Sequence, residues 1–126
     1  MTALELFDVS LARRNSGGGT VYHDLGNINF TFMTARHLYD RKRNLEFIAD
    51  VLRKHYGLPA TVSKRDDIVI NDELKVSGTA AKLGRNTAYH HCTLLCNIQK
   101  DQLKAVLKPN CVRNLKYFFV YFKVSN

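Results

Sequence analysis

The sequence is short of the features that mark disordered, secreted or membrane-spanning chains. Only two of its 126 residues are proline and 45% are hydrophobic, which is typical of one globular domain. The three cysteines are an odd number, so a disulfide framework is not expected and a reducing compartment is the default. No apolar run approaches the ~20 residues that cross a bilayer, and we see no secretory signal or transit peptide.

Acidic residues are also scarce relative to basic ones. Nineteen Lys and Arg face eleven Asp and Glu, which gives a net charge of +8. This balance attracts anionic partners in general and does not choose among nucleic acid, nucleotide phosphate and acidic protein. Nucleic acid is the weakest of these, because the basic residues are scattered and form no recognised motif.

Hydrophobic periodicity in the first half predicts two strands, a loop and a helix. Residues 9–13 and 28–32 alternate as strands do, and the glycine-rich residues 15–19 cannot continue a strand. Further on, apolar residues recur at helical spacing between Asn44, a candidate N-cap, and Gly57, a stop signal. We expect a helix between them.

The second half predicts further strands and a shorter helix. Residues 67–70 read as a buried strand, and after a turn residues 74–80 read as its hairpin partner. Residues 88–97 predict a central strand and residues 100–108 two turns of amphipathic helix. The β-prone run over residues 117–124 either covers a sheet edge or promotes aggregation.

The loop of Ser16, three glycines and Thr20 is the first candidate binding site. Without side chains, successive backbone N–H groups can surround a phosphate or carboxylate, although a glycine run is as often only a tight turn. The P-loop pattern is absent. Arg13 and Arg14 precede the loop; in a strand they point to opposite faces, so at most one reaches a ligand, and both could simply be solvated.

Several other residues carry chemistry with an ordinary structural alternative. His23 follows the loop and could act as a base, a phosphate ligand or a structural hydrogen-bonding group. Zinc is a weak interpretation of His90, His91, Cys92 and Cys96, since adjacent strand residues face opposite ways; buried core residues are the better one. The basic run at residues 41–43 is a solvated face or a contact for an acidic partner.

Four blocks in order resemble the lipoate–protein ligase and lipoyltransferase family, and most closely its mitochondrial lipoyltransferase branch. The resemblance extends from about Leu11 to Leu107. The blocks run from Arg13 to Asn27, from Arg65 to Asp67, from Lys75 to Ala80 and from His90 to Leu95.

The resemblance implies a fold, an activity and partners. The fold is α/β, a mixed sheet flanked by helices, seen here as a partial catalytic domain over residues 11–108 with an unrelated tail over residues 109–126. The implied enzyme is a lipoyltransferase that moves the lipoyl group from lipoyl-adenylate (lipoyl-AMP) to a lysine of an acceptor protein. Implied acceptors are apo lipoyl domains of 2-oxoacid dehydrogenase complexes and the glycine cleavage H protein, in the mitochondrion, with no nucleic acid or membrane partner.

The resemblance also assigns roles to residues. Lys75 matches the motif lysine that stabilises charge on the phosphate and carbonyl oxygens, and no metal ligand is implied. The residues matched to lipoyl-adenylate binding are Arg14, Ser16, Gly18, Gly19, Thr20, His23, Asp67 and Lys82. No cofactor would be bound permanently, although a ligase would use ATP and Mg.

Three alternatives stay open. Many ligases carry arginine where Lys82 stands, which favours transfer over ATP-dependent ligation of lipoate. An octanoyltransferase of the same fold would use a cysteine, but Cys92 and Cys96 lack the surrounding motif. The chain looks truncated at both ends, so we also consider a binding module without turnover and expect weak activity and poor stability from the chain alone.

Overall fold

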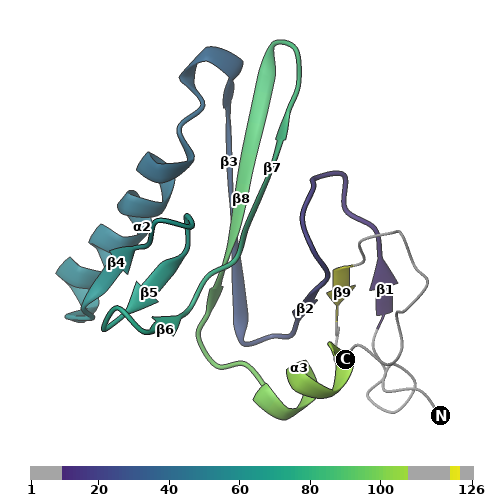
Figure 1. Cartoon of the computed structure of the whole chain (residues 1–126), viewed down its shortest axis with the longest axis vertical. Helices are drawn as coiled ribbons and strands as arrows, with labels where there is room; N and C mark the ends of the chain where they lie inside the picture. The colour runs from purple at the N-terminus through teal and green to yellow at the C-terminus, as the bar shows by residue number, and fades with distance from the viewer. Residues whose placement is uncertain (1–9, 108–119, 123–126) are drawn as a thin grey trace. The chain divides into compact units, whose positions relative to one another are not determined.

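The computed structural model describes residues 10–107 and 120–122, and it places them in two compact units (Figure 1). The first unit contains the residues up to 28 and those from 95 onward, and the second contains residues 29–94. Both mix strands with a helix, so the expected α/β class is confirmed.

The first unit is built on a three-stranded sheet of order β1-β9-β2. Strand β9 (Val120–Phe122) pairs with β1 (Ser10–Ala12) in antiparallel and with β2 (Val21–His23) in parallel orientation. The tail therefore supplies the strand between β1 and β2. Helix α3 (Lys100–Val106) belongs to this first unit.

The second unit contains two small sheets and one long helix. One sheet has the order β3-β8-β7, from β3 (Asn27–Ala35), β8 (Thr87–Leu95) and β7 (Thr79–Leu83). The 3-10 helix η1 (Arg36–Leu38) follows β3. The other sheet has the order β4-β5-β6, and its strands, all antiparallel, are β4 (Ala60–Val62), β5 (Ile68–Ile70) and β6 (Leu74–Lys75).

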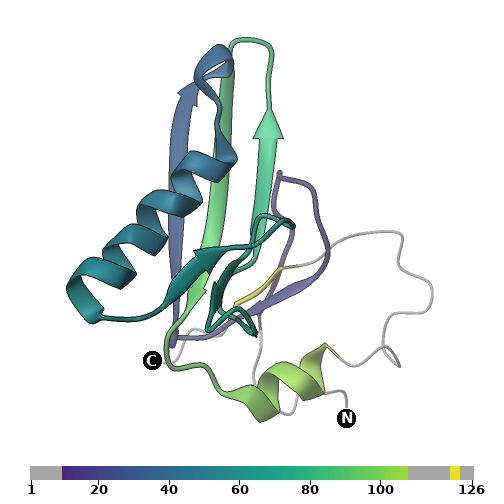
Figure 2. The same ribbon diagram turned by 60° about the vertical axis from the view of Figure 1, so that its left-hand side comes forward.

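The core of the second unit lies under helix α2 (Arg41–Tyr56), which runs along β3 and β8 (Figure 2). The apolar face of α2 provides four of the buried residues, and β4, β5 and β8 provide the rest. The buried cluster consists of Leu45, Ile48, Ala49, Leu52, Ala60, Ile68, Cys92 and Leu94. Helical spacing in the sequence thus marks the face that folding removes from water.

The helix begins earlier than the sequence predicts. Its N-cap is Asp40, whose carboxylate accepts the backbone N–H of Arg43 at 2.9 Å, and its C-cap is Gly57 in the left-handed conformation, as expected. Asn44 does not cap the helix. Its amide nitrogen lies instead 3.3 Å from Nδ1 of His90, so the polar side chain serves a tertiary contact.

The prediction of a single strand over residues 74–80 is also wrong, because this stretch contains two short strands that belong to different sheets. Leu74 and Lys75 pair with β5, whereas β7 begins at Thr79 and pairs with β8. The backbone between them carries no strand pairing but is held by other bonds: Val76 N–H donates to the carbonyl of Ile68 at 3.0 Å. The segment therefore crosses from one sheet to the other.

The remaining elements match the expected ranges within a few residues at each end. The structure ends β1 at Ala12, so Arg13 and Arg14 lie beyond the strand and the argument that they face opposite ways does not apply. Of the run over residues 117–124, only 120–122 are described. Within the described residues, neither helix is long and apolar enough to span a membrane.

Candidate functional site

The glycine loop connects β1 to β2 in the first unit. Ser16 is buried at its base with 2% of its surface exposed, while the three glycines that follow are exposed. Gly18 has a φ of 106°, a conformation that side chains rarely adopt, so a glycine is required at this position. A Cβ built on Gly17 or Gly19 meets nothing within 4 Å, so the backbone there is open to an incoming ligand.

Arg14, two residues after β1, forms hydrogen bonds with backbone carbonyls of the glycine loop. Its Nη2 donates to the carbonyls of Gly17 at 2.9 Å and Gly19 at 2.8 Å, and its Nε donates to Gly17 at 3.3 Å. Burial, followed by the charge of Arg13, lowers the pKa of Arg14. Its Nη1 is buried and has no hydrogen-bond partner among residues 10–107 and 120–122. The guanidinium therefore holds two carbonyls of the loop, and its Nη1 group is not used in these contacts.

The histidine and aspartate after the loop are locked in place. His23 is buried, and the amide nitrogen of Asn27 lies 2.6 Å from its Nδ1. This contact fixes the orientation of the imidazole ring. Asp24 accepts from the backbone N–H of Gly26 and of Gln99, both at 2.8 Å. No local sequence pattern predicts the contact between Asn27 and His23.

Lys75 and Asp67 form an ion pair in the second unit. Nζ of Lys75 lies 2.8 Å from Oδ2 of Asp67, on adjacent antiparallel segments around β5 and β6. The lysine side chain is 58% exposed and the carboxylate 14%, so the ammonium faces solvent while the acid beneath it is nearly covered. Two residues that the sequence assigned separately thus meet in one pair.

The serine of the Lys-Val-Ser-Gly block has a structural role that sequence reasoning missed. Ser77 is buried at 1% exposure, and its hydroxyl accepts the backbone N–H of Ile68 at 2.6 Å. Nearby, the hydroxyl of Thr93 accepts the N–H of Gly78 at 3.0 Å. These bonds hold the backbone of the segment that connects the two sheets. They therefore also restrain the backbone next to Lys75, whose side chain is exposed.

Lys82 and Lys75 belong to different sheets of the second unit. Lys82 is exposed on β7 opposite Tyr89 of β8, and the ring of Tyr89 is tilted against that of His91 with centroids 6.0 Å apart. Lys82 forms no ion pair with another of the residues that the structure describes.

His90 and Cys92 of β8 are buried in the core, as expected, whereas Cys96 follows the strand and is exposed, so the expectation of burial is wrong for Cys96. Burial, with the charges of Arg41 and His91, lowers the pKa of His90 to about 4. Burial raises the pKa of Cys92 to about 11, so this thiol is protonated at neutral pH and a poor nucleophile. Within the described ranges no group of three or more His, Cys, Asp and Glu could hold a metal ion.

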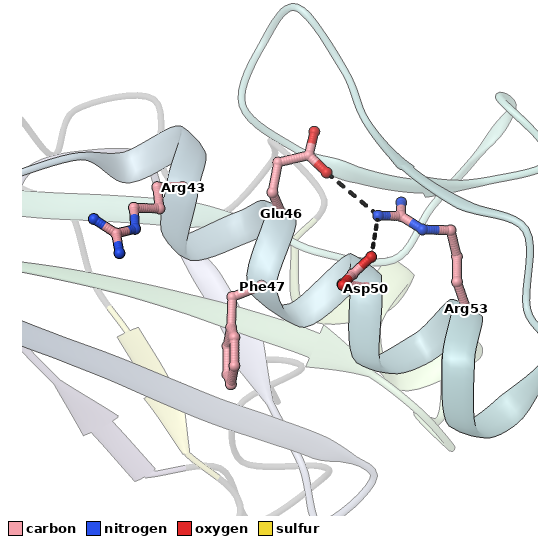
Figure 3. Close-up of a pocket in the computed structure, with 5 residues that line it drawn as sticks. All are labelled: Arg43, Glu46, Phe47, Asp50 and Arg53. Carbon is pink, nitrogen blue, oxygen red and sulfur yellow. Dashed lines mark hydrogen bonds and ion pairs between the residues drawn. The ribbon is translucent and has the colours of Figure 1, made fainter.

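A hollow on α2 is lined by Arg43, Glu46, Phe47, Asp50 and Arg53, and three of these side chains form ion pairs (Figure 3). Arg53 lies 2.9 Å from Asp50 and 3.6 Å from Glu46, and it also donates to the carbonyl of Ala60 at 2.6 Å. Phe47 is exposed at the rim. Both acids of the hollow therefore already have a basic partner. Arg41, expected to be solvated, is in fact paired with Asp66 at 3.0 Å.

The structure therefore brings some of the candidate residues together. Arg14 meets the glycine loop in the first unit, and Lys75 meets Asp67 in the second. A family model for the lipoyl protein ligase A/B catalytic domain matches residues 1–117. The chain belongs to that family.

Among particular proteins, the chain is similar to the human (Homo sapiens) mitochondrial lipoyl amidotransferase LIPT1, with 52% identity over 101 residues. This match covers 79% of the chain and 27% of the relative. It is also 44% identical over 107 residues to lipoate-protein ligase A of Psychrobacter cryohalolentis, covering 85% of the chain and 31% of that protein. The chain thus spans less than a third of the length of either relative.

Solved structures show the same likeness. The structure of LipL1 of Plasmodium falciparum in complex with lipoate matches with a TM-score of 0.77 and 37% identity, covering 91% of this chain and 32% of that one. A bipartite lipoate protein ligase and its E2 lipoyl domain from Thermoplasma acidophilum matches with a TM-score of 0.70 and 30% identity, covering 90% of this chain and 45% of that one.

Proposed function

We propose that the chain carries part of the site of a lipoyltransferase, which moves a lipoyl group from lipoyl-AMP to a lysine of an acceptor protein. The observation that carries this proposal is the similarity to mitochondrial lipoyl amidotransferases, 52% to the human and 49% to the mouse protein. Both relatives are named mitochondrial, so we also propose the mitochondrion as the place of action.

The reaction is one acyl transfer. The uncharged amine of the acceptor lysine attacks the lipoyl carbonyl, the new amide C–N bond forms, and the bond from that carbonyl to the phosphate oxygen breaks. AMP leaves with the electron pair of that bond, and the attacking nitrogen loses one proton. No protein nucleophile is needed, because the acyl-adenylate is already activated. The buried thiol of Cys92 agrees with this, since a cysteine mechanism needs a thiolate.

In this proposal Lys75 supplies positive charge at the reacting oxygens. Its ammonium is exposed and held by Asp67 at 2.8 Å, so it is presented in a fixed position without being covered. A fixed cation stabilises the negative charge that develops on the carbonyl oxygen and on the departing phosphate. Asp67 positions the cation, while Lys82 provides a second cation for the ligand.

The first unit provides the other binding groups. Gly18, Gly19 and Thr20 offer backbone N–H groups to the acyl-phosphate, with Ser16 and Arg14 supporting the loop. His23, whose ring is held by Asn27, is a further ligand-binding residue in this proposal. The acceptors we propose are lipoyl domains and the glycine cleavage H protein; the archaeal relative was solved together with an E2 lipoyl domain.

ATP-dependent ligation is the second candidate, favoured by the 44% identity to a lipoate-protein ligase A. Two donors separate the candidates. The chain is incubated with an apo lipoyl domain and either lipoyl-AMP or lipoate with ATP and Mg, and the acceptor is weighed by mass spectrometry. Modification from lipoyl-AMP alone supports the transferase, and modification from both supports the ligase.

A third outcome would show that the chain binds lipoyl-AMP without transferring the lipoyl group. In that case calorimetry detects lipoyl-AMP binding, but the acceptor keeps its mass over many hours. An acceptor whose target lysine is replaced by arginine is the control, because it must stay unmodified with either donor.

A further inference from the structure

We propose that two copies of this chain associate through the free edge of strand β3, so that their β3-β8-β7 sheets join into one continuous sheet. The occupant of the edge is the β3 strand of the second copy, which runs antiparallel and is centred on the same residue, Thr31. The association is independent of the proposed function, because none of the residues assigned to lipoyl-adenylate belongs to β3.

Strand β3 is a long edge strand. It lies at one end of its sheet, and within the described residues β8 is the only strand to which it is hydrogen-bonded (Figure 1). Its nine residues exceed the average strand length of about 5–6 residues. Along an edge strand, alternate backbone groups point away from the single neighbour and can pair with another chain. Strand β3 is therefore a template for a further strand.

The other edge strands among the described residues have features that normally prevent such pairing. Very short strands and lysine side chains both protect an edge. In the other two sheets the edge strands β1, β2 and β4 have three residues each, and β6 has two. On the opposite edge of the same sheet, β7 has five residues and carries Lys82. Strand β3 contains no charged residue and no proline, so it lacks these protections.

The side chains of β3 suit pairing with a second copy of the same strand. A two-fold axis through Thr31, perpendicular to the sheet, places Thr31 opposite its own copy and Phe30 opposite Phe32. Residues directly opposite each other share one face of the sheet. Phe30 and Phe32 both pack against the buried core cluster, so phenylalanine faces phenylalanine on the core side of each copy. On the exposed side, Met33 lies opposite Asn29.

Net charge makes this edge more favourable for self-association than the charged surface. The whole chain carries a charge of +8, so two copies repel one another at long range. An uncharged strand adds no like-charge contact to this repulsion, and salt screens the remainder. The dimer should therefore become tighter as the salt concentration rises, whereas binding to an acidic protein or to nucleic acid would become weaker.

Position 31 tests both the surface and its register. Thr31 is exposed and lies outside the buried cluster, so a charged side chain there leaves that cluster intact. In the dimer, Thr31→Lys places two lysines opposite one another, and like charges directly opposite are destabilising. Thr31→Glu does the same with two carboxylates. An equal mixture of the two variants should restore pairing, because lysine then faces glutamate across the axis.

Sedimentation equilibrium of the purified 126-residue chain measures the dissociation constant of the dimer. We expect a monomer–dimer equilibrium for the wild type, and a dissociation constant roughly tenfold or more higher for each Thr31 variant alone. The mixture of Thr31→Lys and Thr31→Glu should return toward the wild-type value. Thr87→Lys, at an exposed position of the central strand β8, makes the same change of charge away from the edge and should dimerise as the wild type does.

Amide hydrogen exchange adds a readout in the wild-type chain that needs no variant. A higher protein concentration should slow exchange at alternate amides of β3 and leave the amides of β7 unchanged. A wild-type chain that stays monomeric at every concentration overturns the inference and leaves the edge to a different partner. A dimer or larger assembly that Thr31→Lys does not weaken, a mixture that does not restore pairing, or exchange that slows at β7 instead of β3 also overturns it.

Discussion

Lys75 is the residue on which the proposed chemistry depends most. It is 58% exposed, pairs with Asp67 and is not part of the buried core cluster, so its removal leaves that cluster intact. Exposed ion pairs contribute about 0–1 kcal/mol to stability, whereas a positioned charge at a reacting oxygen is worth about 2.7–4 kcal/mol of barrier. The residue should therefore matter for rate and hardly for folding.

We predict that Lys75→Ala lowers the rate of lipoyl transfer by a factor of roughly 100 to 1000 and changes the unfolding free energy by less than about 1 kcal/mol. Single-turnover transfer and urea denaturation measure the two quantities. Lys64→Ala, another exposed lysine of the same unit, is the control. A loss of rate below tenfold would sink the assignment of Lys75.

Gly26 allows a close approach that no other residue would permit. A Cβ at this position would lie 1.9 Å from the carbonyl oxygen of Asn97, and the carbonyl of Gly26 accepts the N–H groups of Cys96 and Asn97, each at 2.9 Å. The obstacle is backbone on both sides, so it cannot rotate away as a side chain could. Position 26 therefore tolerates no side chain without movement of the chain.

Gly26→Ala should destabilise the protein by about 1–3 kcal/mol or more through overpacking. Gly17→Ala is the control, because its Cβ would meet nothing within 4 Å. Denaturation curves of both variants give the comparison. Equal stability of the two would show that the approach of residue 97 to Gly26 is not part of the folded state.

His90 should make stability depend on pH. It is fully buried, its ring is stacked on Phe32 with centroids 6.0 Å apart, and its folded pKa of about 4 lies below the ordinary value of 6.5. Asn44 and the charges of Arg41, His91 and Asp66 surround it. Below pH 6.5 this histidine binds a proton in the unfolded chain but stays uncharged in the folded chain. The free energy of unfolding therefore falls as the pH drops from 6.5 to about 4.

The full difference between these pKa values corresponds to about 3 kcal/mol. We expect His90→Phe to remove this part of the pH dependence, whereas His55→Phe, at an exposed position of α2, should leave it in place. Unfolding free energies at pH 7, 5.5 and 4.5 provide the test. The same slope in wild type and His90→Phe would contradict the burial of this histidine.

At the scale of elements, β9 joins the two strands between which the glycine loop runs. Strands β1 and β2 flank the loop, and in the described sheet each pairs with β9 rather than with the other. Tyr121 is the central position, opposite Leu11 of β1 and Tyr22 of β2. Residues 120–122 also lie beyond residues 1–117, which the family model matches.

Tyr121→Pro should separate β1 from β2, because proline removes a donor from the middle of a sheet and is confined to edges and bulges. We expect a lower unfolding midpoint, faster amide exchange in β2 and weaker binding of lipoyl-AMP. Ser125→Pro places the same residue outside β9 and is the control. If both variants behave as the wild type does, β9 is not needed to join these strands.

Local sequence patterns predicted some of these elements and could not predict others. Helical spacing and Gly57 located the body and end of α2, because both signals are local. The start was missed because Asp40 and Asn44 are each good caps, and only the tertiary contact with His90 decides between them. The crossing at residues 76–78 was missed because Ser77 finds its partner in β5, nine residues earlier.

The candidate site divides in the same way. Motif resemblance identified Lys75, Asp67, Arg14 and the loop glycines one by one. It could not show that Lys75 and Asp67 are paired or that Arg14 binds loop carbonyls, since a motif records residue types and not directions. Contacts between residues far apart in sequence depend on the folded chain.

At the scale of the whole molecule, the chain belongs to a family of enzymes while spanning 27% of the human relative's length. The central claim is that these residues nevertheless take part in lipoyl transfer. It is a claim about chemistry, so binding alone does not test it.

The most direct measurement is the mass of an apo lipoyl domain after incubation with lipoyl-AMP and an excess of the chain, compared for wild type and Lys75→Ala. We expect the wild-type chain to add one lipoyl group to the acceptor lysine faster than lipoyl-AMP alone does, and we expect Lys75→Ala to fall to that background. Equal modification with wild type, with Lys75→Ala and without protein would contradict the central claim.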